Sequence, residues 1–366
     1  PFLHAGSIFW KRKPIHLTFF VTRKCNLECP YCFYLKSAGD GTPGAPDELS
    51  LDEIGRISAS LGRMLWIAFS GGEPYLRDDL AEIVRVFYRQ NAPAIMLLPT
   101  NGSLPDLIER RTEEILRECG NAVVVVKLSL DGIGESHDAL RRGRDSFEKT
   151  METYSRLGML LPRYPNFELG INTVFSAANE DRMDEIIEFV RGLDHVRTHT
   201  ISMVRGDLAD ETYLRADPRK YERAVDQLAE NMRRGRSPRY RFRGGRVKAA
   251  QDILQRRLIH RTAVEKRRVV PCYAGRLNVV LTETGDVSPC EILTESLGNV
   301  RDYGYDVRRV LRSERAMKAI RAIREGRCRC THECNFITNI LFNPRLYPAL
   351  LGEYLRLSAG GPADSY

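Results

Sequence analysis

The run Thr22-Arg-Lys-Cys-Asn-Leu-Glu-Cys-Pro-Tyr-Cys-Phe-Tyr34 is the most informative stretch of the chain. It follows residues 16–22, a β-branched and aromatic segment that predicts a strand. Its Cys-x3-Cys-x2-Cys spacing offers three thiolates, from Cys25, Cys29 and Cys32, to one metal centre. A [4Fe–4S] cluster normally takes four thiolates, so a three-cysteine set leaves one iron open to bind a small molecule.

Two other interpretations of these cysteines are weaker. The pair Cys29-Pro-Tyr-Cys32 alone is typical of a glutaredoxin redox site. A glutaredoxin is a small single domain with no use for Cys25, whereas this chain has 366 residues. A zinc knuckle usually has a second cysteine pair or histidines close by, but the next cysteines here are Cys119 and Cys272.

Apolar runs alternate with amphipathic segments from residue 15 to about residue 205. Strands are expected at residues 16–22, 66–70, 94–98, 122–130, 167–175 and 198–204. A capping box at Ser50 and Glu53 marks the expected start of one helix. Further helices are expected at residues 77–90, 104–118, 146–157 and 181–193. Six strands that alternate with helices predict an α/β fold of parallel βα units, a barrel or partial barrel. The chemistry of such folds lies in loops that follow the strands, as the cysteine loop does.

The cysteine run resembles the cluster motif of the radical S-adenosylmethionine (SAM) enzymes, and the strand order is similar to their partial (β/α)6 TIM-like barrel. The resemblance implies a [4Fe–4S] cluster on Cys25, Cys29 and Cys32. Its open iron would chelate the amino and carboxylate groups of SAM. The implied reaction is reductive cleavage of SAM to methionine and a 5′-deoxyadenosyl radical, which abstracts a hydrogen atom from a substrate.

Three further motifs each follow a predicted strand. Ser70-Gly-Gly-Glu-Pro74 has glycines that allow close backbone approach and a carboxylate that can accept from an ammonium group. It resembles the family's GGEP motif, which binds the SAM amino group, and Pro99-Thr-Asn-Gly102 resembles the family's TNG turn. Ser129 resembles a family serine that contacts SAM. An arginine twelve positions later pairs with the SAM carboxylate in related enzymes, which implies Arg141 or its neighbour Arg142.

The resemblance also implies contacts between SAM and the later strands. Asn172 and Met203, on the fifth and sixth strands, would lie near adenine and ribose, and the aromatic rings beside the cysteines would pack against adenine. Core packing for these residues, and a surface charge for Asp131 or Arg141, remain as alternatives. The SAM-binding candidates are Tyr31, Phe33, Gly71, Gly72, Glu73, Pro74, Thr100, Asn101, Ser129, Asp131, Arg141, Asn172 and Met203.

Five cysteines lie near the C-terminus. Cys272 and Cys290 flank a predicted hairpin, and a helix-like stretch at residues 306–324 would return the run Cys328-Arg-Cys-Thr-His-Glu-Cys334 to them. The pattern resembles the SPASM domain or its shorter twitch form. It implies one auxiliary [4Fe–4S] cluster on Cys272 and Cys290 plus two of Cys328, Cys330 and Cys334. A structural zinc site is the alternative, because thiolate spacing alone does not separate zinc from iron. His332 is expected to be a polar loop residue, and Cys119 an inert thiol.

Charge is unevenly distributed along the chain. Residues 233–268 carry 14 Lys or Arg against two acids, while the whole chain has a net charge of +8. Such a segment can bind an anionic substrate, a membrane surface or nucleic acid. A solvated helical connector is favoured, and no stable nucleic-acid binding is expected, because aromatic stacking residues are sparse there. No apolar run is long enough to span a bilayer, and the cysteine spacings favour metal binding in a reducing cytoplasm.

The expected domains are an N-terminal extension (1–14), the radical SAM barrel (15–205), a basic helical connector (206–265), a SPASM or twitch domain (266–336) and a C-terminal tail (337–366). The predicted function is a radical SAM enzyme, oxidoreductase-like, that oxidises or rearranges a small metabolite or a peptide. An electron donor such as flavodoxin or ferredoxin is expected. The alternatives are a SPASM-type maturase of a ribosomal peptide or protein, and a non-catalytic iron–sulfur or zinc protein. The last is disfavoured because it has no need of Gly71 to Pro74 or Arg141.

Overall fold

A mixed sheet is the framework of the protein in the computed structural model, which describes residues 2–34, 47–237, 240–293, 295–326 and 328–358. Its strand order is β6-β5-β4-β3-β2-β1-β7-β8-β9. The strands are β1 (His16–Thr22), β2 (Trp66–Gly71), β3 (Ile95–Thr100), β4 (Val123–Ser129), β5 (Phe167–Phe175), β6 (Thr198–Met203), β7 (Asn278–Leu281), β8 (Asp286–Ser288) and β9 (Gly298–Asn299).

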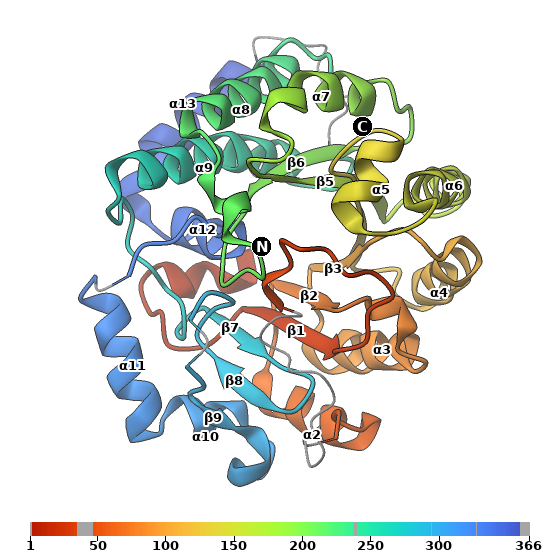
Figure 1. The fold of residues 1–366 in the computed structure, drawn as a ribbon. Helices are drawn as coiled ribbons and strands as arrows, with labels where there is room; N and C mark the ends of the chain where they lie inside the picture. The colour runs from red at the N-terminus through yellow and green to blue at the C-terminus, as the bar shows by residue number, and fades with distance from the viewer. Residues whose placement is uncertain (1, 35–46, 238–239, 294, 327, 359–366) are drawn as a thin grey trace.

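Strands β1 to β6 are parallel and neighbours in sequence order. Helices cover the outer side of this part of the sheet, which confirms the partial (β/α)6 barrel (Figure 1). They are α2 (Leu51–Leu61), α3 (Leu80–Asn91), α4 (Pro105–Glu118), α5 (Glu135–Arg141), α6 (Ser146–Gly158) and α7 (Met183–Arg191). The capping box at the start of α2 is confirmed: the Ser50 hydroxyl accepts from the Glu53 amide, and the Glu53 carboxylate accepts from the Ser50 amide.

The C-terminal part of the chain continues the same sheet. β7 pairs in parallel with β1, in the register His16 to Asn278, and β8 and β9 follow as antiparallel strands. The predicted hairpin is therefore present, but its first strand extends the barrel sheet without a break at the expected boundary of residue 266. The single helix expected at 306–324 is instead two, α10 (Val307–Leu311) and α11 (Glu314–Arg324), because Ser313 caps a new helix by accepting from the Ala316 amide.

Two long helices follow β6, namely α8 (Pro218–Arg233) and α9 (Gly245–Glu265). The expectation of a solvated connector is wrong for α9, because a run of its residues from Ala249 to Arg256 is buried. The helix packs against α12 (Glu333–Leu341) and α13 (Tyr347–Ser358), which lie beside it in Figure 1. Leu357 of α13 joins a buried cluster with Ala250 and Ile253 of α9.

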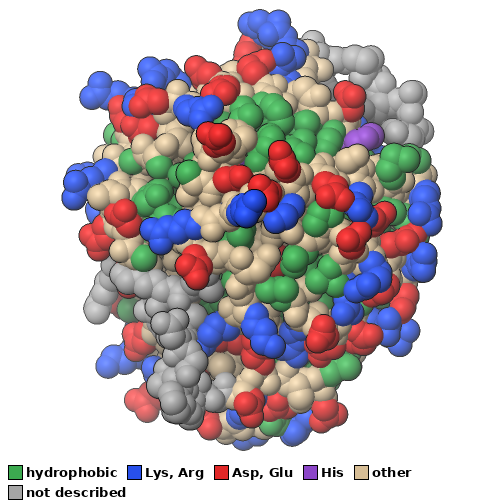
Figure 2. Space-filling view, turned by 45° about the vertical axis from the view of Figure 1, so that its right-hand side comes forward, with side chains coloured by type: hydrophobic (Ala, Val, Ile, Leu, Met, Phe, Trp, Pro, Cys, Tyr) green, Lys and Arg blue, Asp and Glu red, His purple; other side chains and the backbone are tan. Residues whose placement is uncertain are grey.

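Residues 347–358 of the expected tail are thus an ordered helix, whereas the stretch Gly360–Tyr366 lies outside the described residues. A short 3-10 helix, η1 (Phe2–Ile8), begins the described chain. Positive and negative side chains are interspersed over the face drawn in Figure 2, as is common on protein surfaces. In the described part of the chain, no helix is both long and apolar enough to span a membrane.

Candidate functional site

A pocket at the carboxyl ends of β1 to β4 brings together most of the predicted SAM-binding residues. Because parallel strands end at the same edge of a sheet, the loops that follow them meet there. The cysteine loop, the two glycines after β2, the turn after β3 and the end of β4 all contribute. The lining residues predicted from sequence are Cys25, Cys29, Cys32, Tyr31, Phe33, Gly71, Gly72, Thr100, Asn101, Ser129 and Arg141, and Ser70 is an addition to them.

The two glycines after β2 allow the cysteine loop to pack directly on this turn. A Cβ atom on Gly72 would lie 2.2 Å from the Lys24 carbonyl oxygen, and one on Gly71 would lie 2.3 Å from the Thr22 carbonyl oxygen. The Gly72 amide donates to that same Thr22 oxygen at 2.9 Å. A side chain at either position would therefore displace the segment that carries Cys25.

Glu73 lies beneath the pocket and is buried. Its carboxylate accepts from the Thr100 hydroxyl and from the Asn101 amide, both at 2.8 Å. Burial raises the pKa of Glu73 to about 7, although these hydrogen bonds favour the ionised form. The side chain therefore links the turn after β2 to the turn after β3, and a direct contact with SAM stays a prediction. Pro74 is also buried, at the start of η2 (Pro74–Leu76).

Asp131 joins three parts of the site. Its carboxylate accepts from the Tyr31 hydroxyl at 2.5 Å and from the Val174 amide at 2.6 Å, and it pairs with the Arg141 guanidinium at 2.5 Å. Asp131 and Arg141 are both buried, so the alternative of a surface charge is wrong for them. Arg142 is exposed, and Arg141 lines the pocket. Of the two candidate arginines, the one that lines the pocket is thus Arg141, which lies twelve residues after Ser129.

The sulfur atoms of the cysteine loop are partly enclosed. Burial raises the pKa of the Cys25 thiol to about 11, and burial also raises the pKa of Cys29. Arg141 opposes the shift at Cys29, because its Nη1 atom lies 3.9 Å from the Cys29 sulfur. Metal binding requires the thiolate form, so a bound cation would have to offset the effect of burial on Cys25 and Cys29.

A second cavity occupies the interior of the barrel and adjoins the first. Tyr31, Phe33 and Ser70 line both, while Asn172 and Met203 line only the barrel cavity. Its walls include apolar side chains of β2, β3 and β4, and polar side chains of α9 and of the segment around residue 332. Charged residues here that the sequence analysis did not select are Lys127, Arg205, Lys248, Asp252, Glu291 and Glu333. Lys127 could have been selected from the sequence, because it is the one charged residue in the largely apolar strand β4.

The C-terminal cysteines do not all lie in one place. Cys272, Cys290 and Cys328 meet at a buried apolar cluster formed with Ala274 and Ile323. Cys330 packs against the main core instead, but, beyond the effect of burial, its thiol raises the pKa of Cys290, and Cys272 raises the pKa of Cys330. Cys334, in contrast, lines the barrel cavity. Cys119 is buried, as expected of an inert thiol.

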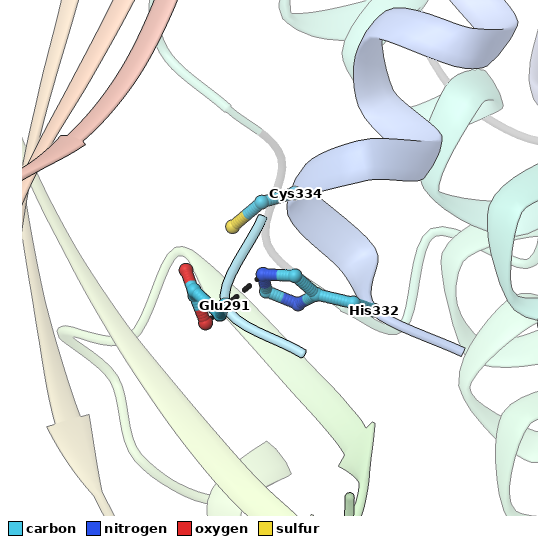
Figure 3. Close-up of side chains that lie close together, drawn as sticks. All are labelled: Glu291, His332 and Cys334. Carbon is cyan, nitrogen blue, oxygen red and sulfur yellow. Dashed lines mark ion pairs between the residues drawn. The ribbon is translucent and has the colours of Figure 1, made fainter. Parts of the chain in front are cut away.

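Glu291, His332 and Cys334 converge at the wall of the barrel cavity, as Figure 3 shows. The Glu291 carboxylate lies 2.9 Å from His332 Nε2. His332 is buried, and Glu291 and the Cys334 thiol favour its charged form, which raises its pKa against the effect of burial. The expectation of a polar loop residue is wrong for His332, because it is a buried ion-pair partner at the start of α12.

The distances between the potential ligand atoms of this trio can be compared with those of the cysteine sets. Its ligand atoms all lie within 4.8 Å of one another, and among the described residues it is the one group of three potential ligands that does so. Tetrahedral zinc with Zn–S bonds of about 2.3 Å requires sulfurs about 3.8 Å apart. The cysteine loop and the C-terminal cysteines are therefore spaced more widely than a compact zinc site requires.

Comparisons with known proteins agree with this geometry. Residues 19–190 match the family model described as the radical SAM superfamily. The chain is 30% identical over 299 residues to an AdoMet-dependent heme synthase of Methanosarcina barkeri, covering 77% of this chain and 78% of that protein. It is 25% identical to the antilisterial bacteriocin subtilosin biosynthesis protein AlbA of Bacillus subtilis, over 80% of this chain and 59% of AlbA.

The fold is also similar to a solved structure of anSMEcpe with bound AdoMet. The TM-score is 0.61 at 19% identity, with 95% of this chain and 98% of that chain covered. That level of identity supports the fold, and the sequence relatives support the family. On these grounds the chain belongs to the radical SAM superfamily and is an enzyme.

Proposed function

We propose that Cys25, Cys29 and Cys32 hold a SAM-binding [4Fe–4S] cluster and that the adjoining pocket binds SAM. The observation that carries the proposal is the convergence of the three thiols with the turns after β2, β3 and β4 in one pocket. The donor set fits, because three enclosed thiols on one loop leave one iron without a protein ligand. The chemistry supplied by the bound cluster and SAM is reductive cleavage of SAM and abstraction of a hydrogen atom from the substrate.

The protein's own residues orient SAM and exclude water. Arg141 offers a cation for the SAM carboxylate, held in place by its buried pairing with Asp131. Thr100 and Asn101 lie at the pocket wall because Glu73 accepts hydrogen bonds from both. Tyr31 and Phe33 line the pocket and the barrel cavity alike, so they would sit between SAM and the substrate. Asn172 and Met203 extend that wall on β5 and β6.

We assign the substrate to the barrel cavity and favour a small metabolite. Side chains from β2 to β6, from α9 and from α12 surround this cavity, which suits a compact molecule. One relative is named a heme synthase, and heme is a small-molecule cofactor rather than a polypeptide. A ribosomal peptide is the second candidate, because AlbA and a sporulation killing factor maturation protein are also relatives.

An auxiliary [4Fe–4S] cluster on Cys272, Cys290, Cys328 and Cys330 completes the proposal. The grouping of these four, and the separate position of Cys334, support this choice of ligands. The auxiliary cluster would accept an electron from the substrate radical or pass electrons inward, with flavodoxin or ferredoxin as the external donor.

Reductive SAM cleavage tests the main proposal. The reconstituted enzyme should release 5′-deoxyadenosine when given SAM and dithionite without oxygen, and the Cys32→Ala variant should release none. Wild-type protein that binds iron but forms no 5′-deoxyadenosine would overturn the proposal.

The substrate class is then found by isotope transfer. Extracts of the source organism grown in deuterated water are separated into a small-molecule filtrate and a peptide fraction. Deuterium should pass to 5′-deoxyadenosine from the filtrate, whereas transfer from the peptide fraction alone would establish the second candidate.

A further inference from the structure

A lysine stands inside the barrel, on a strand that is otherwise buried. Lys127 is on β4, between Val125 and Ser129 on the same face of the strand. Val125 and Lys127 line the barrel cavity, and Ser129 lines the proposed SAM pocket. Two residues along a strand span about 6.6 Å, so the ammonium group belongs to the layer of the barrel next to the SAM pocket.

The other charged side chains of this cavity have partners. Lys248 pairs with Asp252, and Arg205 lies 3.0 Å from Glu333 and 3.7 Å from Glu291. His332 pairs with Glu291 at 2.9 Å. Each of these charges is therefore compensated within the protein.

Lys127 differs from them. Its ammonium group donates to the Thr200 hydroxyl on β6, and among the residues that the structure describes no carboxylate lies within 4.0 Å of it. The facing charged groups are Lys248, Asp252 and Arg256 on α9 and the thiol of Cys334 on α12. Burial, together with Lys248 and Arg256, lowers the pKa of Lys127 to about 8, so the ammonium form still predominates at neutral pH.

An uncompensated ammonium group in a buried strand is costly, and an apolar side chain would fit the run of valines around it better. The stem of Lys127 is held against β5, where a Cβ on Gly170 would lie 3.4 Å from Lys127 Cγ. The side chain thus lines the cavity with its stem packed on β5, and the described part of the chain supplies no carboxylate partner for its ammonium group.

We propose that Lys127 binds an anionic oxygen group, a carboxylate or a phosphate, of the substrate. This inference rests on the proposed function, since it assigns the barrel cavity to the substrate. The anionic end of the molecule would lie at Lys127 and Thr200, and its reacting carbon would point toward the pocket bounded by Ser129 and Arg141. Trp66, Ile95 and Leu97 line the same cavity and suit an apolar or aromatic body. The substrate class is an amphipathic acid.

Competitive labelling tests this without turnover. The reconstituted enzyme with SAM is exposed to a trace of acetic anhydride, and acetylation of Lys127 is measured by peptide mass spectrometry. Glutarate and inorganic phosphate are the probes, each compared with sodium chloride at equal ionic strength. Lys248, paired in the same cavity, and Lys318, exposed on α11, are the internal controls.

One probe should slow acetylation of Lys127 several-fold and leave both control lysines unchanged. Protection by glutarate identifies a carboxylate site, and protection by phosphate a phosphate site. Equal labelling of Lys127 with both probes and with chloride overturns the inference. Uniform protection of all three lysines does the same, because it reflects bulk anion effects.

A variant separates this inference from the proposed function. Lys127→Gln should keep the iron content of the wild type, while hydrogen transfer from the active extract fraction falls at least several-fold. Lys127→Arg should restore part of that transfer. Wild-type protein without SAM cleavage would instead refute the proposed function itself. Unchanged transfer in Lys127→Gln would refute only the anionic subsite.

Discussion

The two cysteine sets of this protein are built in different ways. The N-terminal set lies on one loop directly after β1, and each of its neighbours follows another parallel strand. The C-terminal set is drawn from a segment before β7, the end of a hairpin and the approach to α12, so that its first and last segments lie 56 positions apart, at Cys272 and Cys328. The comparison teaches that parallel βα order places a site at a known edge of the sheet. The C-terminal cysteines, in contrast, come together only through the packing of segments distant in sequence.

The largest expected effect comes from removing the N-terminal set. Replacing Cys25, Cys29 and Cys32 together by Ala should lower the iron content of the reconstituted protein from about eight to about four per chain, since each [4Fe–4S] cluster holds four irons. SAM cleavage should be lost completely. Iron and sulfide assays with the 5′-deoxyadenosine assay check both. Four irons falling to none would mean that the C-terminal cysteines hold no iron–sulfur cluster.

The second prediction separates the C-terminal cysteines from one another. Cys328→Ala should remove about four irons and keep SAM cleavage, because one thiolate of the auxiliary cluster is lost. Cys334→Ala is the matched control and should keep the full iron content, since its thiol lines the barrel cavity. The reverse outcome would make Cys334 a ligand and would break the proposed division between the two places.

The third prediction compares the buried Arg141 with its exposed neighbour Arg142. Arg141→Met removes the partner of Asp131 and leaves that carboxylate buried, which should cost about 3–5 kcal/mol of unfolding free energy. It should also weaken SAM binding. Arg142→Met, at an exposed neighbour, should change neither quantity. Urea unfolding and equilibrium dialysis with SAM are the measurements. If both variants weakened SAM binding equally, Arg141 would have no specific role in binding SAM.

The smallest expected effect comes from the glycines that seat the cysteine loop. Gly72→Ala places a methyl group 2.2 Å from the Lys24 carbonyl oxygen, and the forced shift should cost about 1–3 kcal/mol. The N-terminal cluster should load less iron, while the auxiliary cluster is unaffected. Gly55→Ala, in α2 with no atom within 4 Å of the new Cβ, should gain up to about 1 kcal/mol. Normal iron loading in Gly72→Ala would show that the loop tolerates the displacement.

The sequence predicted the barrel well for a physical reason. The β-branched and aromatic runs are buried on both faces, so their apolar content marks each strand, and the capping box marks the start of α2. Ser129 and Arg141 line one pocket, as their spacing of twelve residues predicts, while the contact of Arg141 with SAM stays a prediction. The predictions were poorer in the C-terminal part. The sequence predicts a solvated connector where α9 is buried, because charges such as Lys248 and Asp252, which read as solvated, pair with each other inside the protein.

The sequence by itself determined the family, the three-thiol loop and the order of the parallel strands, because each depends on residues close together in the chain. Only the tertiary structure decided which cysteines meet, that Glu73 lies beneath the pocket, and that Cys334 faces the barrel with Glu291 and His332. It also decided that Lys127 faces a cavity in which none of the described carboxylates pairs with it. These facts depend on contacts between segments far apart in sequence, and local patterns carry no information about them.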